Sequence, residues 1–299
     1  MIYVNEYTII VPKKIENTVE GFEFLINFIN EVKNIRNSKI IIDFSKTRWL
    51  EANLTAVLGA IFHFMFKNNN KINLYRISNS TRKVLEKNGF LQSFGLESSE
   101  EDVYETTIKY TKFKNEDRVE FQEYLKNEFI PKINLTMTKA FSKELRLNLE
   151  EVFQNARTHG RCNNIYVCGQ YYYSQKKVKF TIVDLGVTIL ENVKNKFNKE
   201  LPADYAIDWA TKDGNSTKID ESGGIGLYQL REFLRENGGR TQIVSSNGYW
   251  EEYDNKITHV VYKNSFMGTI VNIEVDINDK VYISKDEKNK INKIISNIF

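Results

Sequence analysis

Hydrophobic and polar positions in the second half of the chain alternate with two different periods. Between residues 145 and 156 apolar side chains recur every three or four positions, which predicts an amphipathic helix with one buried face. Residues 180–183 are apolar with only Thr181 interposed, which indicates a buried strand. A second helical spacing covers residues 227–234, and Gly238 and Gly239 supply its stop.

Strands and helices alternate in the first hundred or so residues. Such alternation is typical of an α/β sandwich. Residues 39–44 are almost continuously apolar, as expected of a strand whose sheet is covered on both faces. Strands are predicted at 7–11, 39–44 and 71–75, and helices at 22–29, 54–66 and 81–87.

An acidic stretch without bulky side chains, residues 97–102, separates two compositionally different halves. A helix is predicted over residues 119–130, ending before Pro131, and the isoleucine spacing after Lys280 predicts a terminal helix packed loosely on the body. The fold class expected is α/β, with each unit an α+β two-layer sandwich. The expected division is a domain at 1–98, a linker at 99–114, a mixed-sheet domain at 115–278 and a helical tail at 279–299.

Charge and composition narrow the classes of partner. The 299 residues have a net charge of +3, and the basic residues are dispersed, so no nucleic-acid partner is expected. No apolar run reaches the length of ~18 residues that a membrane helix needs, so no membrane partner is expected. Cys162 and Cys168 lack metal-ligand spacing and are expected to be reduced thiols in a cytoplasmic protein.

Polar chemistry is concentrated beside the first of the two helices. Glu151, Asn155 and His159 stand at i, i+4 and i+8, so their side chains follow one stripe next to the apolar face. A carboxylate next to an amide suits a base that activates water beside a metal ligand. Solvation alone also explains an asparagine on an amphipathic helix, so this stripe by itself leaves both readings open.

Two later motifs favour a nucleotide site. Asp184 ends the apolar strand and can accept a hydrogen bond from an amino group, while Gly186 permits close approach of a flat ligand. Glycines at 223, 224 and 226 precede the second helix, where free backbone N–H groups and the helix dipole attract anions. Taken alone, the aspartate motif could equally be an ordinary turn after a strand, and the glycines could be a flexible connection before a helix.

From about Met137 to Val275, the chain resembles the GHKL family of ATP-binding domains, which includes DNA gyrase, sensor histidine kinases and anti-sigma-factor serine kinases. The resemblance implies that Asn155 holds Mg²⁺ and that Glu151 is the catalytic general base in hydrolysing members. It also implies that Asp184, the first residue of an Asp-x-Gly-x-Gly motif, binds the adenine amino group.

The remaining motifs follow in the family's order, with one departure. Thr188 occupies the place of the second glycine of the aspartate motif, which puts the local lid geometry in doubt. Gly224 to Leu227 match the glycine motif, and Thr269 matches the threonine near the adenine. The segment between Gly186 and Gly223 would be the ATP lid. The cofactor-binding residues implied are Asn155, His159, Asp184, Gly186, Ser216, Thr217, Gly223, Gly224, Gly226, Leu227 and Thr269.

The N-terminal part resembles, less specifically, a STAS domain, the fold of anti-sigma-factor antagonists. The likeness depends on the strand at 41–44, the loop Trp49–Asn53 and the helix after it. Regulatory members carry a phosphorylated serine in that loop, whereas this chain has Glu51-Ala52-Asn53-Leu54. An interaction module is therefore expected, without a phosphorylation switch at this loop.

Three functions remain open at this point. The first is a regulatory protein that binds Mg²⁺ and ATP and couples slow hydrolysis to binding of a partner. The second is a protein serine/threonine kinase that acts on a separate STAS-like partner, and the third is a module that binds ATP without turnover. The expected partner is a regulatory protein, such as a sigma factor, a STAS-like protein or an effector, and a homodimer is compatible with all three.

Overall fold

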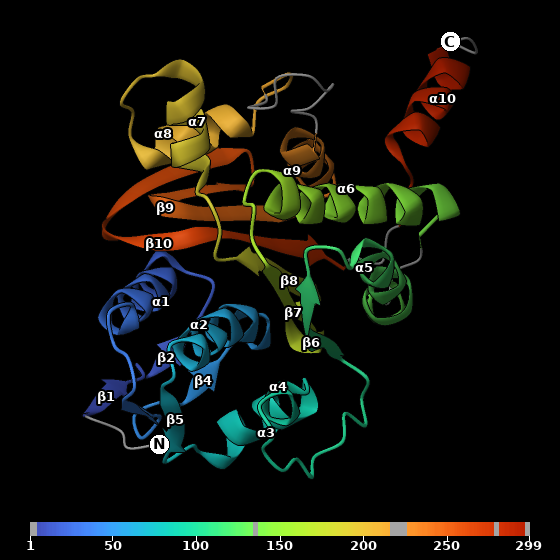
Figure 1. The fold of residues 1–299 in the computed structure, drawn as a ribbon. Coiled ribbons are helices and arrows are strands. Elements are labelled where there is room, and N and C mark those ends of the chain that lie inside the picture. Colours follow the sequence, from blue (N-terminus) through green and yellow to red (C-terminus); the bar gives the residue numbers. More distant parts are fainter. Residues whose placement is uncertain (1–4, 134–136, 216–225, 278–280, 297–299) are drawn as a thin grey trace.

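Two larger β-sheets and two helical layers alternate through the molecule in the computed structural model, and β2 (Lys14–Ile15) pairs with β4 (Trp49–Leu50) in a small third sheet (Figure 1). The structure describes residues 5–133, 137–215, 226–277 and 281–296. A three-stranded parallel sheet comes first, then two helices, then a five-stranded antiparallel sheet, and then the remaining long helices. The chain thus has the expected α/β class, built as two stacked sheet-and-helix sandwiches.

The first sheet contains β1 (Glu6–Ile10), β3 (Lys39–Asp43) and β5 (Lys71–Tyr75) in the order β1-β3-β5. The helices α1 (Val19–Val32) and α2 (Thr55–Lys67) cover one of its faces. The side chain of Thr18 caps α1 by accepting a hydrogen bond from the N–H of Gly21. The smaller elements are β2 (Lys14–Ile15), β4 (Trp49–Leu50), the turn Ala52–Leu54, α3 (Asn79–Lys87) and α4 (Phe90–Ser93).

One expectation about β3 is wrong. Ile40 and Ile42 are fully buried against the helices, whereas Ile41 on the opposite face is only partly buried. The run of isoleucines indicated a sheet covered on both faces, but only one face is fully buried. Ile41 accounts for the difference. Isoleucine favours a strand through its β-branched side chain even where it is partly exposed, so an isoleucine run does not prove burial on both faces.

The second sheet has the order β6-β7-β8-β10-β9, and every neighbouring pair is antiparallel. The expectation of a mixed sheet is therefore wrong for this sheet. Short turns join β7 to β8 and β9 to β10, and such hairpins impose antiparallel pairing. Its strands are β6 (Thr107–Lys114), β7 (Asn164–Tyr172), β8 (Lys177–Asp184), β9 (Arg240–Tyr253) and β10 (Lys256–Asp276).

The predicted linker at 99–114 also needs correction, because its second half is the edge strand β6. Ile108, Tyr110 and Phe113 are buried, so these residues belong to the folded body. The acidic composition of residues 97–102 signalled a connection correctly, but the apolar alternation that follows it was included in the linker.

Helices cover the face of the second sheet that is turned away from α1 and α2. Here α6 (Lys139–Thr158) and α9 (Gly226–Glu236) lie against β8, β9 and β10, with α5 (Arg118–Tyr124) beside α6. In the described ranges no helix is long and apolar enough to cross a membrane. The remaining helical elements are the turns Leu125–Phe129 and Ile130–Lys132, α7 (Ile189–Phe197), α8 (Ala203–Ala210) and α10 (Lys285–Ser296).

The two halves share one hydrophobic core. Apolar side chains of α1 and α2 pack against both sheets, so residues such as Phe22 and Ile61 belong to the same cluster as Tyr110, Tyr166 and Val183. The helices α1 and α2 are therefore an internal layer, and the N-terminal unit covers one whole face of the second sheet.

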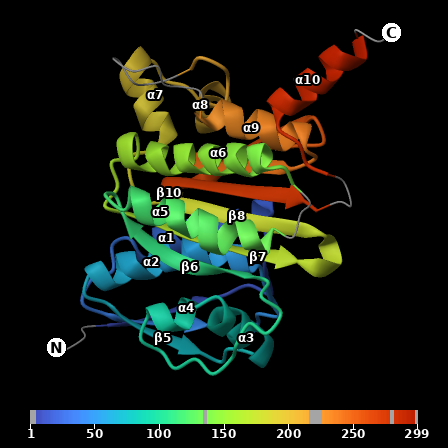
Figure 2. The ribbon, with the colours of Figure 1, turned by 90° about the vertical axis from the view of Figure 1, so that its right-hand side faces the viewer.

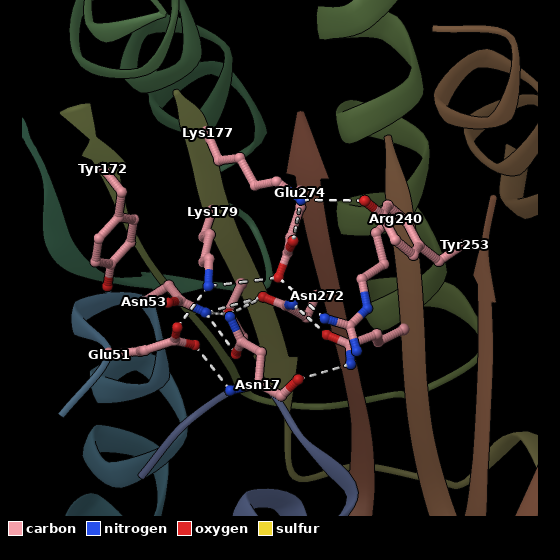
Figure 3. Close-up of polar contacts among 12 residues, drawn as sticks. Asn17, Glu51, Asn53, Tyr172, Lys177, Lys179, Arg240, Tyr253, Asn272 and Glu274 are labelled. Atoms are coloured by element: carbon pink, nitrogen blue, oxygen red, sulfur yellow. Dashed lines mark hydrogen bonds and ion pairs between the residues drawn. The ribbon is translucent and has the colours of Figure 1, made fainter. Parts of the chain in front are cut away.

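A buried polar network joins the halves at this interface (Figure 3). The Glu51 carboxylate accepts hydrogen bonds from Lys179 Nζ at 2.5 Å and from the N–H of Asn17 at 2.8 Å. Asn53 Nδ2 lies 2.9 Å from Thr181 Oγ1 and 2.9 Å from Asn272 Oδ1, and both acceptors belong to the second sheet. The loop that resembles the STAS phosphorylation loop is thus sealed against a sheet.

Burial dominates the electrostatics of this network. It raises the pKa of Glu51 because the charged form loses solvation, although the Lys179 ammonium opposes the shift. Removing one member of a buried ion pair leaves its partner charged and unsolvated, which costs more than losing both.

We expect Lys179→Met to lower the free energy of unfolding by about 3–5 kcal/mol, because Glu51 would stay buried without its cation. The double variant Glu51→Gln/Lys179→Met should recover part of that loss. Urea unfolding monitored by tryptophan fluorescence measures both.

Lys177→Met is the matched control, since Lys177 lies on the same strand but its side chain is more exposed and faces Glu274 and Asp276 near the sheet's rim. It should cost about 1 kcal/mol. Equal, small losses for Lys179→Met and Lys177→Met would contradict a stabilising role for the buried pair.

Candidate functional site

The helix α6 carries the predicted polar stripe. Thr138 begins the helix by accepting a hydrogen bond from the N–H of Phe141, and the apolar positions predicted from the sequence face the second sheet. Glu151 is exposed and Asn155 is half-buried beside that face. Within the described part of the chain, neither side chain has a hydrogen bond or an ion pair, so both polar groups are available to a ligand.

The first turn of α9 lies directly against Glu151. A Cβ added to Gly226, the first residue of α9, would lie 2.8 Å from Glu151 Cβ and 3.1 Å from Glu151 Oε2. Glycine is therefore required where the two helices meet, because any larger residue would push them apart. Leu227 is partly buried and packs on the core beneath. The structure thus brings Gly226, the described glycine of the motif, against Glu151.

Asp184 ends β8 on the side of the sheet that α6 covers. Its carboxylate is 4% exposed, and Oδ1 accepts a hydrogen bond from the N–H of Gly186 at 2.8 Å. Oδ2 has no hydrogen-bond partner in the described ranges. Burial raises the pKa of Asp184 to about 7, with the Gly186 hydrogen bond opposing the shift. A buried acceptor of this kind suits a ligand with an N–H donor.

Three glycines crowd the backbone around Asp184. A Cβ at Gly160, just after α6, would lie 3.0 Å from Asp184 Oδ1, and a Cβ at Gly186 would lie 2.0 Å from the Gly160 carbonyl oxygen. Gly268 has a φ of +114°, and its added Cβ would lie 2.1 Å from the Asp184 carbonyl oxygen. Side chains are excluded here, because neighbouring backbone atoms already occupy the space that each Cβ would need.

Thr269 pairs with Asp184 across the sheet, so these two predicted site residues are neighbours. Its hydroxyl lies 2.9 Å from Ser245 Oγ, which also accepts a hydrogen bond from the N–H of Ile189 at the start of α7. Ser245 is fully buried and was not predicted from the sequence, because a serine within a strand gives no local signal.

His159 caps the end of α6 and connects it to the predicted lid. Its carbonyl oxygen accepts a hydrogen bond from Asn192 Nδ2 at 3.1 Å, so α7 is tied to the end of α6. Two lysines of the predicted lid form ion pairs within it, Lys194 with Glu200 and Lys212 with Asp208. Ser216, Thr217, Gly223 and Gly224 lie outside the described residues.

The described site residues lie on one face of the second sheet. The helix α6 contributes Glu151 and Asn155, β8 contributes Asp184, and the start of α9 meets Glu151. Gly160 lies beside Asp184, and its N–H donates a hydrogen bond to the main-chain carbonyl oxygen of Asn155 at 3.0 Å. Comparison with protein-family models and with curated proteins finds no match to this chain. The chemistry of the site is therefore argued from its geometry.

The raised pKa of Asp184 predicts a pH-dependent stability. In the folded chain the carboxyl group is neutral up to about pH 7, whereas in the unfolded chain it ionises near its ordinary value of 3.8. This group's contribution is full below about pH 4 and is lost as the pH rises to 7. Between pH 5 and 7 the wild type should lose about 2–3 kcal/mol of unfolding free energy relative to Asp184→Asn.

Urea unfolding at several pH values provides the measurement, with the exposed Asp213→Asn as the control variant. Asp213→Asn should follow the wild type throughout. Parallel stability curves for the wild type and Asp184→Asn would contradict the raised pKa.

Proposed function

We propose that this protein is a regulatory ATPase of the GHKL type, which binds Mg²⁺ and ATP between α6 and α9 and hydrolyses ATP slowly. The observation that carries the proposal is the contact of Gly226 with Glu151. It brings the start of a helix, where anions bind, against a carboxylate that has no ion pair in the described ranges.

The available polar groups fit such a ligand. The Asn155 amide oxygen would be a ligand of Mg²⁺, a cation that prefers oxygen donors. Bound Mg²⁺ would neutralise phosphate charge. Asp184 Oδ2 would accept a hydrogen bond from the adenine amino group.

Glu151 would be the general base. Its side chain is exposed beside the first turn of α9, so it can reach a water molecule and hold the proton removed from it. The start of α9 fixes the direction of this side chain by packing against its Cβ.

The position of the STAS-like loop favours hydrolysis or transfer to another protein over transfer within the chain. Glu51 and Asn53 lie on the opposite face of the second sheet from α6, and both are buried. The N-terminal unit therefore cannot present this loop to Glu151. A separate regulatory protein is the partner that fits the proposal.

Substitutions separate the roles of the three residues. Asp184→Asn should weaken ATP binding more than binding of other triphosphates, because an amide that keeps the Gly186 hydrogen bond turns an N–H donor, and no acceptor, toward the adenine amino group. Asn155→Ala should remove the Mg²⁺ dependence of binding. Glu151→Gln should retain ATP binding and lower turnover by about 100-fold or more. Isothermal titration calorimetry and release of labelled phosphate from γ-labelled ATP measure these effects.

Glu150→Gln is the matched control for Glu151→Gln, because Glu150 is the next residue on α6 and its carboxylate accepts a hydrogen bond from Gln122 instead. It should hydrolyse ATP like the wild type. If Asp184→Asn and Asn155→Ala both bind Mg²⁺ and ATP like the wild type, the site assignment is wrong. Label that appears on an added protein instead of as free phosphate would establish the kinase alternative.

A further inference from the structure

Strand β10 has an open edge along its first half. It pairs with β9 from Lys256 to Glu274, whereas β8 pairs with it only from Thr269 to Asp276. Within the described part of the chain, no strand therefore neighbours residues 256–261 on the side away from β9. Figure 1 shows the β9–β10 hairpin extending past the end of β8, and in both views β10 lies between the layer of α6 and the layer of α1 and α2 (Figures 1 and 2). This stretch is thus an edge strand, although the rest of β10 lies inside the sheet.

The turn at the tip of the hairpin decides which backbone groups face the open edge. Asp254 and Asn255 both have positive φ, of 51° and 57°, as in a type I′ turn, and Tyr253 pairs with Lys256 across them. The N–H of Lys256 therefore points to β9, and so does the N–H of every second residue after it. The N–H and C=O groups of residues 257, 259 and 261 consequently point away from β9, into the open edge.

The side chains of these three residues lie on the α8 side of the hairpin. His259 Nδ1 is 3.3 Å from Asp204 Oδ2 of α8, and its ring lies against the exposed ring of Tyr205. Since alternate residues of a strand face the same side, Ile257 and Val261 lie on this side too. They are 42% and 53% exposed. Apolar surface therefore lies directly beside the open backbone groups.

The usual protection of an edge strand is missing here. Edge strands commonly carry lysines, prolines or bulges that prevent pairing with another chain. Residues 257–262 read Ile-Thr-His-Val-Val-Tyr, with no permanent charge and mostly β-branched or aromatic side chains. The outer strand β6, by contrast, has lysines at positions 109, 112 and 114. The edge of β10 is therefore suited to an extended segment, because only a strand satisfies alternating N–H and C=O groups.

We propose that this edge pairs with the same edge of a second copy of the chain, antiparallel and centred on His259. A two-fold interface uses the same patch on both subunits, so an edge that pairs with itself must match its own groups. Centring on His259 places Ile257 opposite Val261 of the second copy, and this apolar pair occurs twice. Moving the centre by one residue in either direction would place Ile257 opposite a histidine or opposite Lys263 instead.

In this register the second copy supplies each kind of group that the edge can bind. Residues 257 and 261 face each other and 259 faces its own copy, and each facing pair exchanges two backbone hydrogen bonds. Lys263 stands opposite Asn255 of the second copy and next to its Asp254. Neither Lys263 nor Asp254 has an ion pair in the described part of the chain, so opposite charges meet at both ends of the contact. This interface uses no residue of the candidate ATP site.

Amide hydrogen exchange of the wild-type chain tests the interface directly. At about 100 μM the chain should sediment at twice its mass of 35.0 kDa, since a short edge contact gives a modest affinity. The amides of residues 257, 259 and 261 should then exchange at least about tenfold more slowly than at about 1 μM. The amides of Thr258 and Val260 are internal controls, because they face β9 at both concentrations. A monomer at the higher concentration, or a dimer whose three edge amides exchange equally at both, would overturn the proposal.

Charge pairs at positions 257 and 261 test the register. Ile257→Lys/Val261→Lys and Ile257→Glu/Val261→Glu place like charges opposite each other, so each should raise the dimer dissociation constant at least about tenfold. Ile257→Lys/Val261→Glu places opposite charges there and should restore most of the affinity. Analytical ultracentrifugation measures each dissociation constant.

Thr8→Lys/Ile10→Lys is the matched control for the lysine pair, because it adds two lysines at exposed positions of β1, an edge strand of the other sheet. It should dimerise like the wild type. If the three variants at positions 257 and 261 dissociate equally, or if the β1 variant is monomeric, the edge of β10 is not the interface.

Discussion

The fold depends on burying both faces of the five-stranded sheet. The face that the N-terminal unit covers has polar side chains at its centre. Thr181 and Asn272 project from that face and would be costly to bury without partners. Asn53, from a loop more than a hundred residues earlier, lies within hydrogen-bond distance of both. The match between this loop and the sheet therefore fixes the position of the N-terminal unit, because hydrogen bonds need a defined geometry, whereas apolar contact alone tolerates sliding.

The spacing of apolar residues predicted those helices and strands whose buried face can be recognised from their own sequence. The helices α6 and α9 followed from apolar spacing, and Phe180 and Ile182 placed β8 correctly. The interface could not be predicted in this way. Lys179 and Thr181 look like the solvent face of a half-buried strand, and only the three-dimensional structure shows that Glu51 and Asn53 cover them.

Some residues of the candidate site could likewise be predicted from local sequence, and others could not. Glu151 and Asn155 were predictable because they are four residues apart on one helix, and Asp184 because it ends an apolar strand. The packing of Gly226 on Glu151 was not predictable, since it depends on how two helices approach each other across the sheet. Ser245 joins the site through strand register alone, by pairing β9 with β10 opposite Asp184.

The two faces of strand β8 contact different halves of the molecule. Asp184 and Ile182 face the helices of the candidate site, while Lys179 and Val183 face the N-terminal unit. A shift of β8 caused by a ligand at Asp184 would have to break the Glu51–Lys179 pair, at a cost of several kcal/mol. Changes at the site are therefore accommodated more readily by α7, which Asn192 and Ile189 tie to the site by single hydrogen bonds.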